Sequence, residues 1–270
     1  MIKRITELLI QFLEIDISSY EESFIEKSIN KKMDDARCDS LEDYFELLKI
    51  SANERSILID SLKNSYSEFF RNPLSFSVLE RIVLPQLVAK LKNKSHGELR
   101  IWSAACASGQ EVYSLAMLLE EMRSVSAEHF SYRIFATDKS EEQINKAQAG
   151  FYTGNDLNNV TMRRIKRWFT KQGENYSVIP ELKQNIHYSV FDLFDENLSA
   201  PPASIFGDFD IVLCANILFY YRGGHKDMIL KKVRNSLSEE GILLTGESER
   251  DILLSAGFRE VYPQSAIFRG

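Results

Sequence analysis

The segment 99–119 constrains the fold of this chain strongly, because an apolar run passes directly into a turn of small residues and then into a helical pattern. Residues 103–109 read SAACASG, so no side chain in the turn is larger than cysteine. A ligand can approach the backbone closely only where side chains are nearly absent, and the N–H groups of such a turn can line a pocket. The segment therefore predicts a buried strand, a tight turn and a helix, with a nucleotide or nucleoside site at the turn.

The turn carries neither of the common phosphate-binding motifs. The three glycines of the dinucleotide fingerprint and the Gly-Lys-Ser/Thr ending of a phosphate loop are both absent. Glu111 instead stands near the predicted helix start. The helix dipole favours an anion there, and a carboxylate repels phosphate and attracts a cationic group such as an amino-acid ammonium. Taken alone, Glu111 is better explained as a cap of its helix.

Polar residues also stand at the ends of the following apolar runs. Asp138, Asp192 and Asn216 each close or nearly close such a run. In doubly wound folds an acid at the second strand end holds ribose hydroxyls, and ligands bind in the crevice beyond the carboxyl ends of parallel strands. Asp138 is also explained as the N-cap of the helix that follows it, and the two roles are compatible.

The composition argues against several classes of protein. A net charge of −6 and a pI near 5.4 disfavour nucleic acid or an anionic membrane as the main partner. No run is long and uncharged enough to span a bilayer, and residues 1–12 are unlike a secretion signal, so a cytoplasmic protein is expected. The three cysteines and four histidines lie far apart, which predicts no disulfide, no metal site and no catalytic histidine.

Residues 1–72 are predicted to form a separate helical domain, because no glycine or proline precedes Pro73 and the apolar spacing is helical throughout. Ser40 begins a capping pattern that opens one helix, and another helix covers about residues 53–62. A linker helix is expected over 73–97. The inward face of the first helix is assigned to five apolar residues: Ile5, Leu8, Leu9, Phe12 and Leu13.

Residues 98–270 alternate between strand and helix patterns, which predicts βαβ units and a parallel sheet covered on both faces. The stretch of about 168–189 breaks this rhythm. Its turn residues and short apolar runs predict a small antiparallel hairpin, inserted before the strand that ends at Leu193.

Six motifs occur in one order along the chain. They are Phe69-Phe70-Arg71, Ile101-Trp-Ser-Ala-Ala105, Gly109-Gln-Glu-Val-Tyr-Ser114, Ala136-Thr-Asp138, Cys214-Ala-Asn216 with Tyr220, and Gly246-Glu-Ser-Glu249. With these motifs the chain resembles the CheR family of chemotaxis receptor methyltransferases over nearly its whole length. The resemblance implies an α/β fold: a Rossmann-like class I methyltransferase domain that binds S-adenosylmethionine (SAM), an N-terminal all-helical domain and a small inserted β-hairpin subdomain. It also implies methyl transfer to receptor glutamates, in sensory adaptation, with S-adenosylhomocysteine as the product of the cofactor.

The resemblance assigns roles to single residues. Arg71 and Tyr220 would be catalytic and lie beside the departing methyl group, although Tyr220 is also explained as a core aromatic residue. Glu111 would meet the methionine end of the cofactor, and Asp138 its ribose hydroxyls. Asp192, Leu193, Asn216 and Ile217 would lie around the adenosine of the cofactor. The other cofactor-binding positions would be Ser65, Ser67, Arg71 and Ala105.

The chain departs from the family pattern at several places. Ser65 and Ser67 stand where asparagine and threonine are usual, and Ser67 keeps the hydroxyl. Further departures are Val112 for proline, Ala215 for arginine and Glu247 for histidine. None of them removes an obvious reacting group. A glutamate carboxylate is already ionised at neutral pH and can attack the methyl group directly, so the reaction needs orientation, which we assign to Arg71, rather than a general base.

The expected partner is the cytoplasmic helical bundle of a chemotaxis receptor, which the family meets with a basic helix. Here Lys27, Lys31 and Lys32 are followed by Asp34 and Asp35, so the charge complementarity is weaker, and from the residues alone a solvated face explains the lysines better. The short hairpin loop predicts recognition without a receptor tail peptide. We expect a monomer without nucleic acid or membrane insertion. A methyltransferase for another protein carboxylate or small acid, and a non-catalytic SAM-binding regulator, stay open as alternatives.

Overall fold

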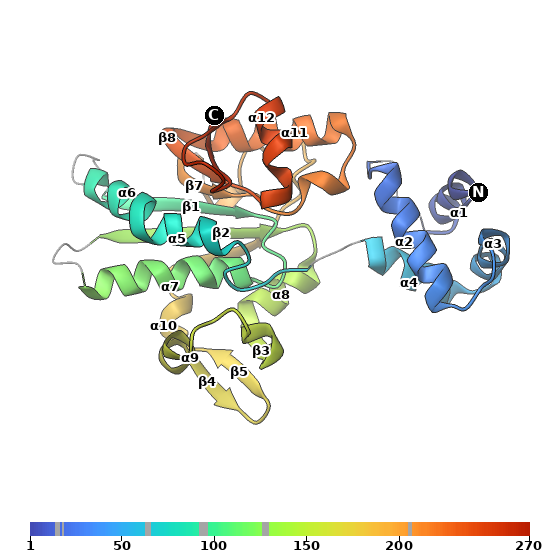
Figure 1. Ribbon diagram of the computed structural model, residues 1–270, viewed down its shortest axis with the longest axis horizontal. Coiled ribbons are helices and arrows are strands. Elements are labelled where there is room, and N and C mark those ends of the chain that lie inside the picture. The colour runs from blue at the N-terminus through green and yellow to red at the C-terminus, as the bar shows by residue number, and fades with distance from the viewer. Residues whose placement is uncertain (14–16, 18, 63–65, 92–96, 126–129, 205–206) are drawn as a thin grey trace. The chain divides into compact units, whose positions relative to one another are not determined.

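The computed structural model describes residues 1–13, 17, 19–62, 66–91, 97–125, 130–204 and 207–270. Within it the chain forms two compact units (Figure 1). The first unit comprises Met1–Asn64 together with Leu218–Lys226, and the second comprises Ser65–Ile217 with Asp227–Gly270. The first unit is therefore built from two stretches that lie far apart in the sequence.

The first unit is helical, with α1 (Ile2–Leu13), α2 (Glu22–Asp35), α3 (Leu41–Ile50) and α4 (Ala52–Leu62). The predicted cap of α3 is confirmed, since the Ser40 side chain accepts a hydrogen bond from the Asp43 N–H at 3.2 Å. The helices bury apolar faces against one another, and each fully buried aliphatic side chain contributes roughly 1.5–3 kcal/mol. The fully buried residues of this core include Ile5, Leu9, Ile29, Tyr44, Leu48 and Leu58.

The inward face predicted for α1 is wrong at Phe12. This side chain is 50% exposed, and the Arg55 guanidinium stacks over its ring at 4.4 Å. A cation over an aromatic face stabilises a ring that the core does not cover. The side chain of Leu13 lies outside the described residues.

The second unit contains a sheet with the strand order β6-β2-β1-β7-β8-β10-β9. The strands are β1 (Glu98–Ala104), β2 (Ser131–Asp138), β6 (Ile186–Val190), β7 (Phe209–Leu213), β8 (Leu237–Leu244), β9 (Arg259–Glu260) and β10 (Ile267–Arg269). Pairs among β6, β2, β1, β7 and β8 are parallel, whereas β10 is antiparallel to both β8 and β9. The parallel sheet is therefore confirmed for these five strands, and the sequence did not predict the antiparallel edge, which is common in mixed sheets.

The two faces of the central strands carry different side chains, as the alternation of a strand requires. Ile101 of β1 is in register with Ile134 of β2 and Ile211 of β7, and all three belong to one core with apolar residues of the neighbouring helices. On the next position the Trp102 ring is buried and lies 5.6 Å from the ring of Phe209. Both faces of the sheet are therefore covered, as predicted.

Helices surround this sheet (Figure 1). The predicted linker helix is present as α5 (Pro73–Val78), a π-helical stretch (Leu79–Val83) and α6 (Leu84–Leu91), and residues 92–96 lie outside the described part of the chain. α6 contacts β1, α7 (Gln110–Val125) contacts β2, and α8 (Glu141–Ala149) contacts β2 and β6. The remaining α-helices of the described residues are α9 (Met162–Trp168), α10 (Pro180–Lys183), α11 (Gly223–Ser236) and α12 (Arg250–Ser255).

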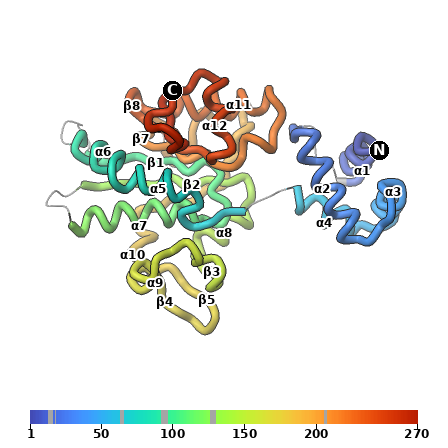
Figure 2. The backbone as a smooth tube through the Cα atoms, in the orientation of Figure 1, coloured from blue at the N-terminus to red at the C-terminus, as the bar shows by residue number. Residues whose placement is uncertain are grey.

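A small antiparallel sheet projects from the second unit (Figure 2). The predicted hairpin is confirmed as β4 (Phe169–Gln172) and β5 (Asn175–Val178), with Gly173 at a φ of +62° in the turn. The sequence did not predict the third strand, β3 (Phe151–Thr153), which pairs with β5. The end of the predicted insert is also wrong, because 186–190 form β6, which pairs with β2 of the main sheet.

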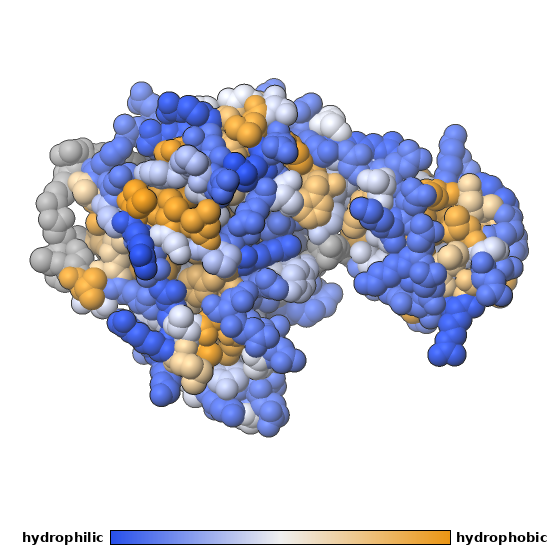
Figure 3. All heavy atoms as spheres, in the orientation of Figure 1, coloured by the Kyte–Doolittle hydropathy of each residue, from blue (hydrophilic) through white to orange (hydrophobic). Residues whose placement is uncertain are grey.

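The surface is mostly hydrophilic on the face that Figure 3 draws, with apolar residues exposed over parts of the second unit. Leu74 and Ile82 are among its exposed large apolar side chains. Within the described ranges, no helix combines the length and the apolar character needed to cross a bilayer.

Candidate functional site

The strand order reverses between β1 and β7. From β1 the chain proceeds to β2 and β6 in one direction, and from β7 to β8 in the other. In open α/β sheets, ligands bind beyond the carboxyl ends of the strands at such a reversal. The turn after β1 and the loop after β7 both begin at this position, and they contain Ala105, Asn216 and Ile217.

The turn between β1 and α7 has a strained backbone. Ala105 and Ala107 have φ values of 147° and 46°, and Gly109 has a φ of 90°. Such values cost free energy for residues other than glycine and tend to occur at functional sites. A Cβ on Gly109 would lie 2.9 Å from the Cβ of Ala147, so this position also lacks room for a side chain. Glycine at position 109 is therefore favoured by both its conformation and its packing.

Asp138 ends β2 and holds this turn. Its Oδ2 accepts the Ala107 N–H at 3.0 Å, and its Oδ1 accepts the Ser140 N–H at 2.9 Å. Burial raises the pKa of Asp138, and the hydrogen bonds from the backbone of Ser140 and Ala107 lower it in part. The N-cap alternative is wrong, since the helix after β2 is capped by Ser140, whose Oγ accepts the Gln143 N–H. Each Asp138 oxygen still has acceptor capacity for a hydroxyl.

Glu111 lies in the first turn of α7 and is 7% exposed. Among the described residues no hydrogen bond contributes to the pKa of its carboxyl group, so the structure does not support a capping role. Burial raises the pKa of Glu111 to about 7; the positive charge of Arg71 lowers it and the negative charge of Glu249 raises it. The site therefore holds a nearly buried acid whose ionised form is favoured by the nearby charge of Arg71.

The backbone around Arg71 is fixed by contacts of the segment 69–72. The Phe70 N–H donates to Ser114 Oγ at 3.0 Å, and the Arg164 guanidinium stacks over the Phe70 ring at 4.7 Å. Asn72 is buried and its Nδ2 donates to the Thr245 carbonyl at 3.3 Å. These contacts on both sides of Arg71 fix the backbone from which its partly buried side chain extends.

Arg71 is held by its neighbour Tyr66. Nη1 of Arg71 donates to the Tyr66 carbonyl at 3.2 Å, and its guanidinium lies 5.3 Å from the centre of the Tyr66 ring. Between them in the sequence, the Oγ of Ser67 is buried and has no hydrogen-bond partner among the residues that the structure describes. Ser65 lies outside the described residues.

The loop after β7 is organised by a carboxylate that the sequence did not single out. The N–H groups of Asn216 and Ile217 donate to Oε2 and Oε1 of Glu249, both at 2.7 Å. Asn216 has a φ of 59°, and its Oδ1 is buried without a partner in the described chain. Buried polar atoms are nearly always hydrogen-bonded, so this atom and Ser67 Oγ point to a polar ligand.

Asp192 and Leu193 lie beyond β6, which ends at Val190 and not at Leu193 as expected. Asp192 is exposed and its Oδ1 accepts the Phe194 N–H at 2.9 Å, whereas Leu193 is buried. The Phe191 N–H donates to the Asp138 carbonyl at 3.0 Å. This bond brings the loop with Asp192 and Leu193 to the end of β2.

Tyr220 belongs to the helical unit. Its ring lies 4.7 Å from that of Phe24, and its carbonyl accepts the Glu21 N–H at 2.8 Å. The alternative role, that of a core aromatic residue, fits the neighbouring Tyr221 better, because Tyr221 is 5% exposed and its ring stacks on that of Tyr20 at 5.1 Å. Tyr220 is only partly buried, so its aromatic ring is not a core residue of this unit.

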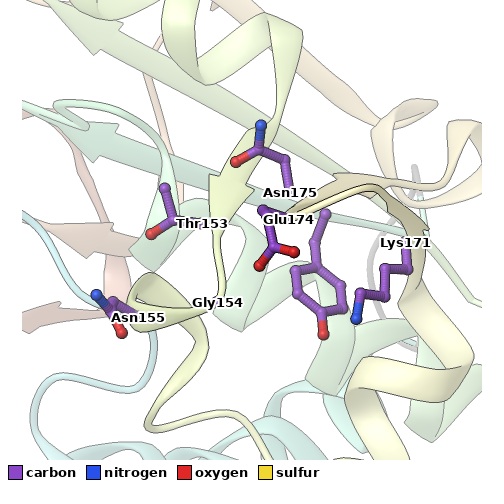
Figure 4. A pocket seen from close by; sticks show the side chains of 7 residues that line it. Thr153, Gly154, Asn155, Lys171, Glu174 and Asn175 are labelled. Carbon is purple, nitrogen blue, oxygen red and sulfur yellow. The ribbon is translucent and has the colours of Figure 1, made fainter.

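A polar pocket of about 290 Å³ lies on the small antiparallel sheet (Figure 4). It is lined by Thr153 at the end of β3, by residues 154–155 that follow, and by Lys171, Glu174, Asn175 and Tyr176 of the hairpin. None of the predicted site residues that the structure describes lines this pocket. The strand-end residues and this pocket are thus two separate features of the second unit.

Comparison with known proteins gives matches along both units. The family profile "CheR methyltransferase, SAM binding domain" matches residues 65–260, and the profile "CheR methyltransferase, all-alpha domain" matches residues 1–62. A chemotaxis protein methyltransferase of Listeria innocua is 30% identical over 245 residues, which is 91% of this chain and 88% of that protein. Chemotaxis protein methyltransferase 1 of Pseudomonas aeruginosa is 30% identical over 90% of this chain and 89% of its own length. The chemotaxis protein methyltransferase of Escherichia coli is 26% identical over 92% of this chain and 83% of its own.

Proposed function

The chain belongs to the CheR methyltransferase family, and on that premise we propose that it methylates glutamate side chains of chemoreceptors to form methyl esters. The observation that carries the proposal is a nearly buried acid, Glu111, at the start of α7 beside the reversal point of the sheet, with the positive charge of Arg71 near enough to lower its pKa. An acid there suits the cationic end of the cofactor, and a guanidinium suits a substrate carboxylate.

The described residues fit the cofactor SAM. Glu111 offers a carboxylate to an ammonium group, and Asp138 keeps acceptor capacity for ribose hydroxyls. Asn216 Oδ1 and Ser67 Oγ are buried polar atoms that need a partner. Ala105 lies in the turn after β1, where its small side chain leaves the backbone accessible to the cofactor. When bound, SAM supplies a methyl group activated by its attachment to a positively charged sulfur.

Arg71 acts in this proposal as the group that orients the substrate. A glutamate carboxylate is ionised at neutral pH, so the chain need not remove a proton. A guanidinium presents several N–H donors in a fixed plane, and one Arg71 donor is used by the Tyr66 carbonyl. The remaining donors can hold a carboxylate while one of its lone pairs stays available. Holding two reactants in the correct geometry supplies much of the rate of such a reaction.

Tyr220 is the second proposed catalytic residue. Its position on the helical unit is fixed by the Glu21 N–H and the Phe24 ring, both near the start of α2. We propose that its hydroxyl takes part in the transfer step. A Tyr220→Phe variant keeps the ring and its packing against Phe24, so a loss of turnover in this variant reports the hydroxyl alone.

The proposed partner surface is the basic part of α2. Lys27 and Lys31 are exposed, whereas Lys32 forms an ion pair with Asp35 at 2.8 Å. Two exposed lysines give a modest attraction to an acidic receptor bundle, mainly through the rate of association. The connection between β4 and β5 is only Gly173 and Glu174, which supports recognition without a receptor tail peptide.

The test is transfer of a radiolabelled methyl group from SAM to a cytoplasmic receptor fragment. Label that is released by mild base identifies a carboxyl ester, and a fragment with its acceptor glutamates changed to glutamine should take up none. Label on another protein or on a small acid would support a different acceptor. Cofactor binding without transfer to any acceptor would contradict the proposed activity and favour a non-catalytic regulator.

A further inference from the structure

The turn after β8 contains a fully buried acid. Glu249 is 0% exposed, and its two oxygens accept hydrogen bonds from two separate parts of the chain. Oε2 accepts the Asn216 N–H at 2.7 Å, the Thr245 hydroxyl at 2.7 Å and the Gly246 N–H at 3.0 Å. Oε1 accepts the Ile217 N–H at 2.7 Å. One side chain therefore joins the end of β8 to the end of β7.

These hydrogen bonds stabilise a strained backbone conformation in the loop after β7. Asn216 has a φ of 59°, which costs free energy for a residue with a side chain. Its N–H and that of Ile217 bind different oxygens of the same carboxylate, so the orientation of both peptide groups is fixed. Removing an acceptor would leave buried donors unsatisfied, and that loss is larger than the net gain from an ordinary hydrogen bond.

Gly246 provides space for the Asn216 side chain. A Cβ on Gly246 would lie 2.4 Å from Nδ2 of Asn216 and 3.0 Å from Oε2 of Glu249. Its φ of −74° and ψ of 147° are open to any residue, so the backbone does not require glycine here. The requirement comes from the Asn216 amide, which packs against Gly246 and keeps its Oδ1 buried without a described partner.

We propose that Glu249 is a positioning residue for the cofactor site, which fixes Asn216 and Ile217 for the adenosine end of SAM, and that Gly246 sets the direction of the Asn216 amide. This inference rests on the proposed function in so far as that function puts Asn216 and Ile217 in contact with the cofactor. Glu249 itself acts through these two residues and need not touch the cofactor.

The first experiment measures cofactor affinity rather than activity. Calorimetry with S-adenosylhomocysteine and with methylthioadenosine, which lacks the amino-acid end, is carried out on the full chain and on Glu249→Gln and Glu247→Gln. Glutamine has the size of glutamate, but its NH₂ group faces an N–H donor in either orientation. We expect Glu249→Gln to raise the Kd for both ligands about tenfold or more, with one site per molecule. Glu247 is exposed in the same turn, so Glu247→Gln is the matched control and should leave both values unchanged.

A purely structural role for Glu249 gives a different result. It would lower the midpoint of thermal unfolding and leave both Kd values as in the unchanged chain, and this outcome would overturn the inference. Absence of binding by the unchanged chain would overturn it as well, together with the cofactor site. Binding without methyl transfer to receptor fragments would contradict the proposed function alone, since neither Kd depends on the acceptor.

A second experiment does not depend on the folding of Glu249→Gln. Gly246→Ala is expected to raise the Kd for methylthioadenosine about tenfold, because the new Cβ displaces the Asn216 amide. In an Asn216→Ala background the same change should alter the Kd less than about twofold, because the group that it displaces is gone. Additive effects of the two substitutions would show that Gly246 does not act through Asn216.

Discussion

Replacing Glu111 by glutamine is expected to stabilise the protein without cofactor while weakening its hold on the cofactor. Burial raises the pKa of Glu111 from its ordinary value of 4.5 to about 7. Between these two values the folded protein keeps a proton that the unfolded chain has released. The stabilisation that this proton provides is complete below about pH 4.5 and is lost as the pH rises through 7.

The magnitude follows from the same two pKa values. One pKa unit corresponds to about 1.4 kcal/mol, so at about pH 8 the charged, buried Glu111 costs the protein roughly 3 kcal/mol. Glutamine has the same shape and no charge. Glu111→Gln should therefore raise the free energy of unfolding by roughly 2–3 kcal/mol at about pH 8 and leave it nearly unchanged at about pH 4.5.

The assay is urea unfolding of the cofactor-free protein across this pH range, with Glu247→Gln as the control for the loss of an exposed charge. Calorimetry with S-adenosylhomocysteine gives the second half of the prediction. Between about pH 8 and pH 6 the ionised fraction of Glu111 falls about tenfold, so the Kd of the unchanged protein should rise about tenfold and that of Glu111→Gln should not. A variant that is no more stable than the unchanged protein at the higher pH would refute the reasoning.

Three further substitutions test other contacts of the site. Arg71→Ala should lower methyl transfer about a hundredfold or more because the acceptor loses its orientation, and should raise the Kd for S-adenosylhomocysteine because Glu111 loses the positive charge that favours its ionised form, while the unfolding curve stays close to that of the unchanged protein; full turnover would remove Arg71 from the mechanism. Asp138→Asn should raise that Kd about tenfold, because one acceptor oxygen of the β1–α7 turn becomes a donor that faces an N–H group; an unchanged calorimetric Kd would speak against its role. Gly109→Ala should lower the free energy of unfolding by about 1–3 kcal/mol in urea titrations, because its φ is 90° and its Cβ would lie 2.9 Å from that of Ala147; an equally stable variant would show that the turn can relax.

The elements that the sequence predicted correctly are those with a local cause. The helices of the first unit follow from apolar spacing, and the start of α3 follows from the Ser40 cap. The turn at 103–109 follows from small residues alone. Each of these patterns is decided within a few residues, so no knowledge of distant contacts was needed.

The elements that the sequence missed depend on distant partners. Residues 186–190 have the alternation of any half-buried strand, and only their pairing with β2 places them in the main sheet. The direction of β10 is likewise set by β8. Phe12 fits the apolar period of α1, but the Arg55 guanidinium covers it and the core does not.

The residues of the candidate site also divide into those that a local pattern predicts and those that depend on distant contacts. Glu111, Asp138 and Asn216 stand at strand or helix ends that the apolar pattern predicts. The role of Glu249 could not be predicted in this way, because a glutamate in a polar turn is ordinarily exposed. Its buried carboxylate accepts the N–H groups of Asn216 and Ile217, which lie 33 and 32 residues earlier in the chain and which the sheet brings to it. The motif around Gly246 was the one available signal.

The helical unit cannot be exchanged between relatives as a single N-terminal cassette. Its second stretch, residues 218–226, contributes Tyr221, which stacks on Tyr20, and Arg222, whose Nε donates to the Tyr20 carbonyl at 2.8 Å. Lys226 also pairs with Glu21 at 2.6 Å. A hybrid protein that takes residues 1–64 from another homologue will need the matching nonapeptide from the same donor, or these contacts will be mismatched.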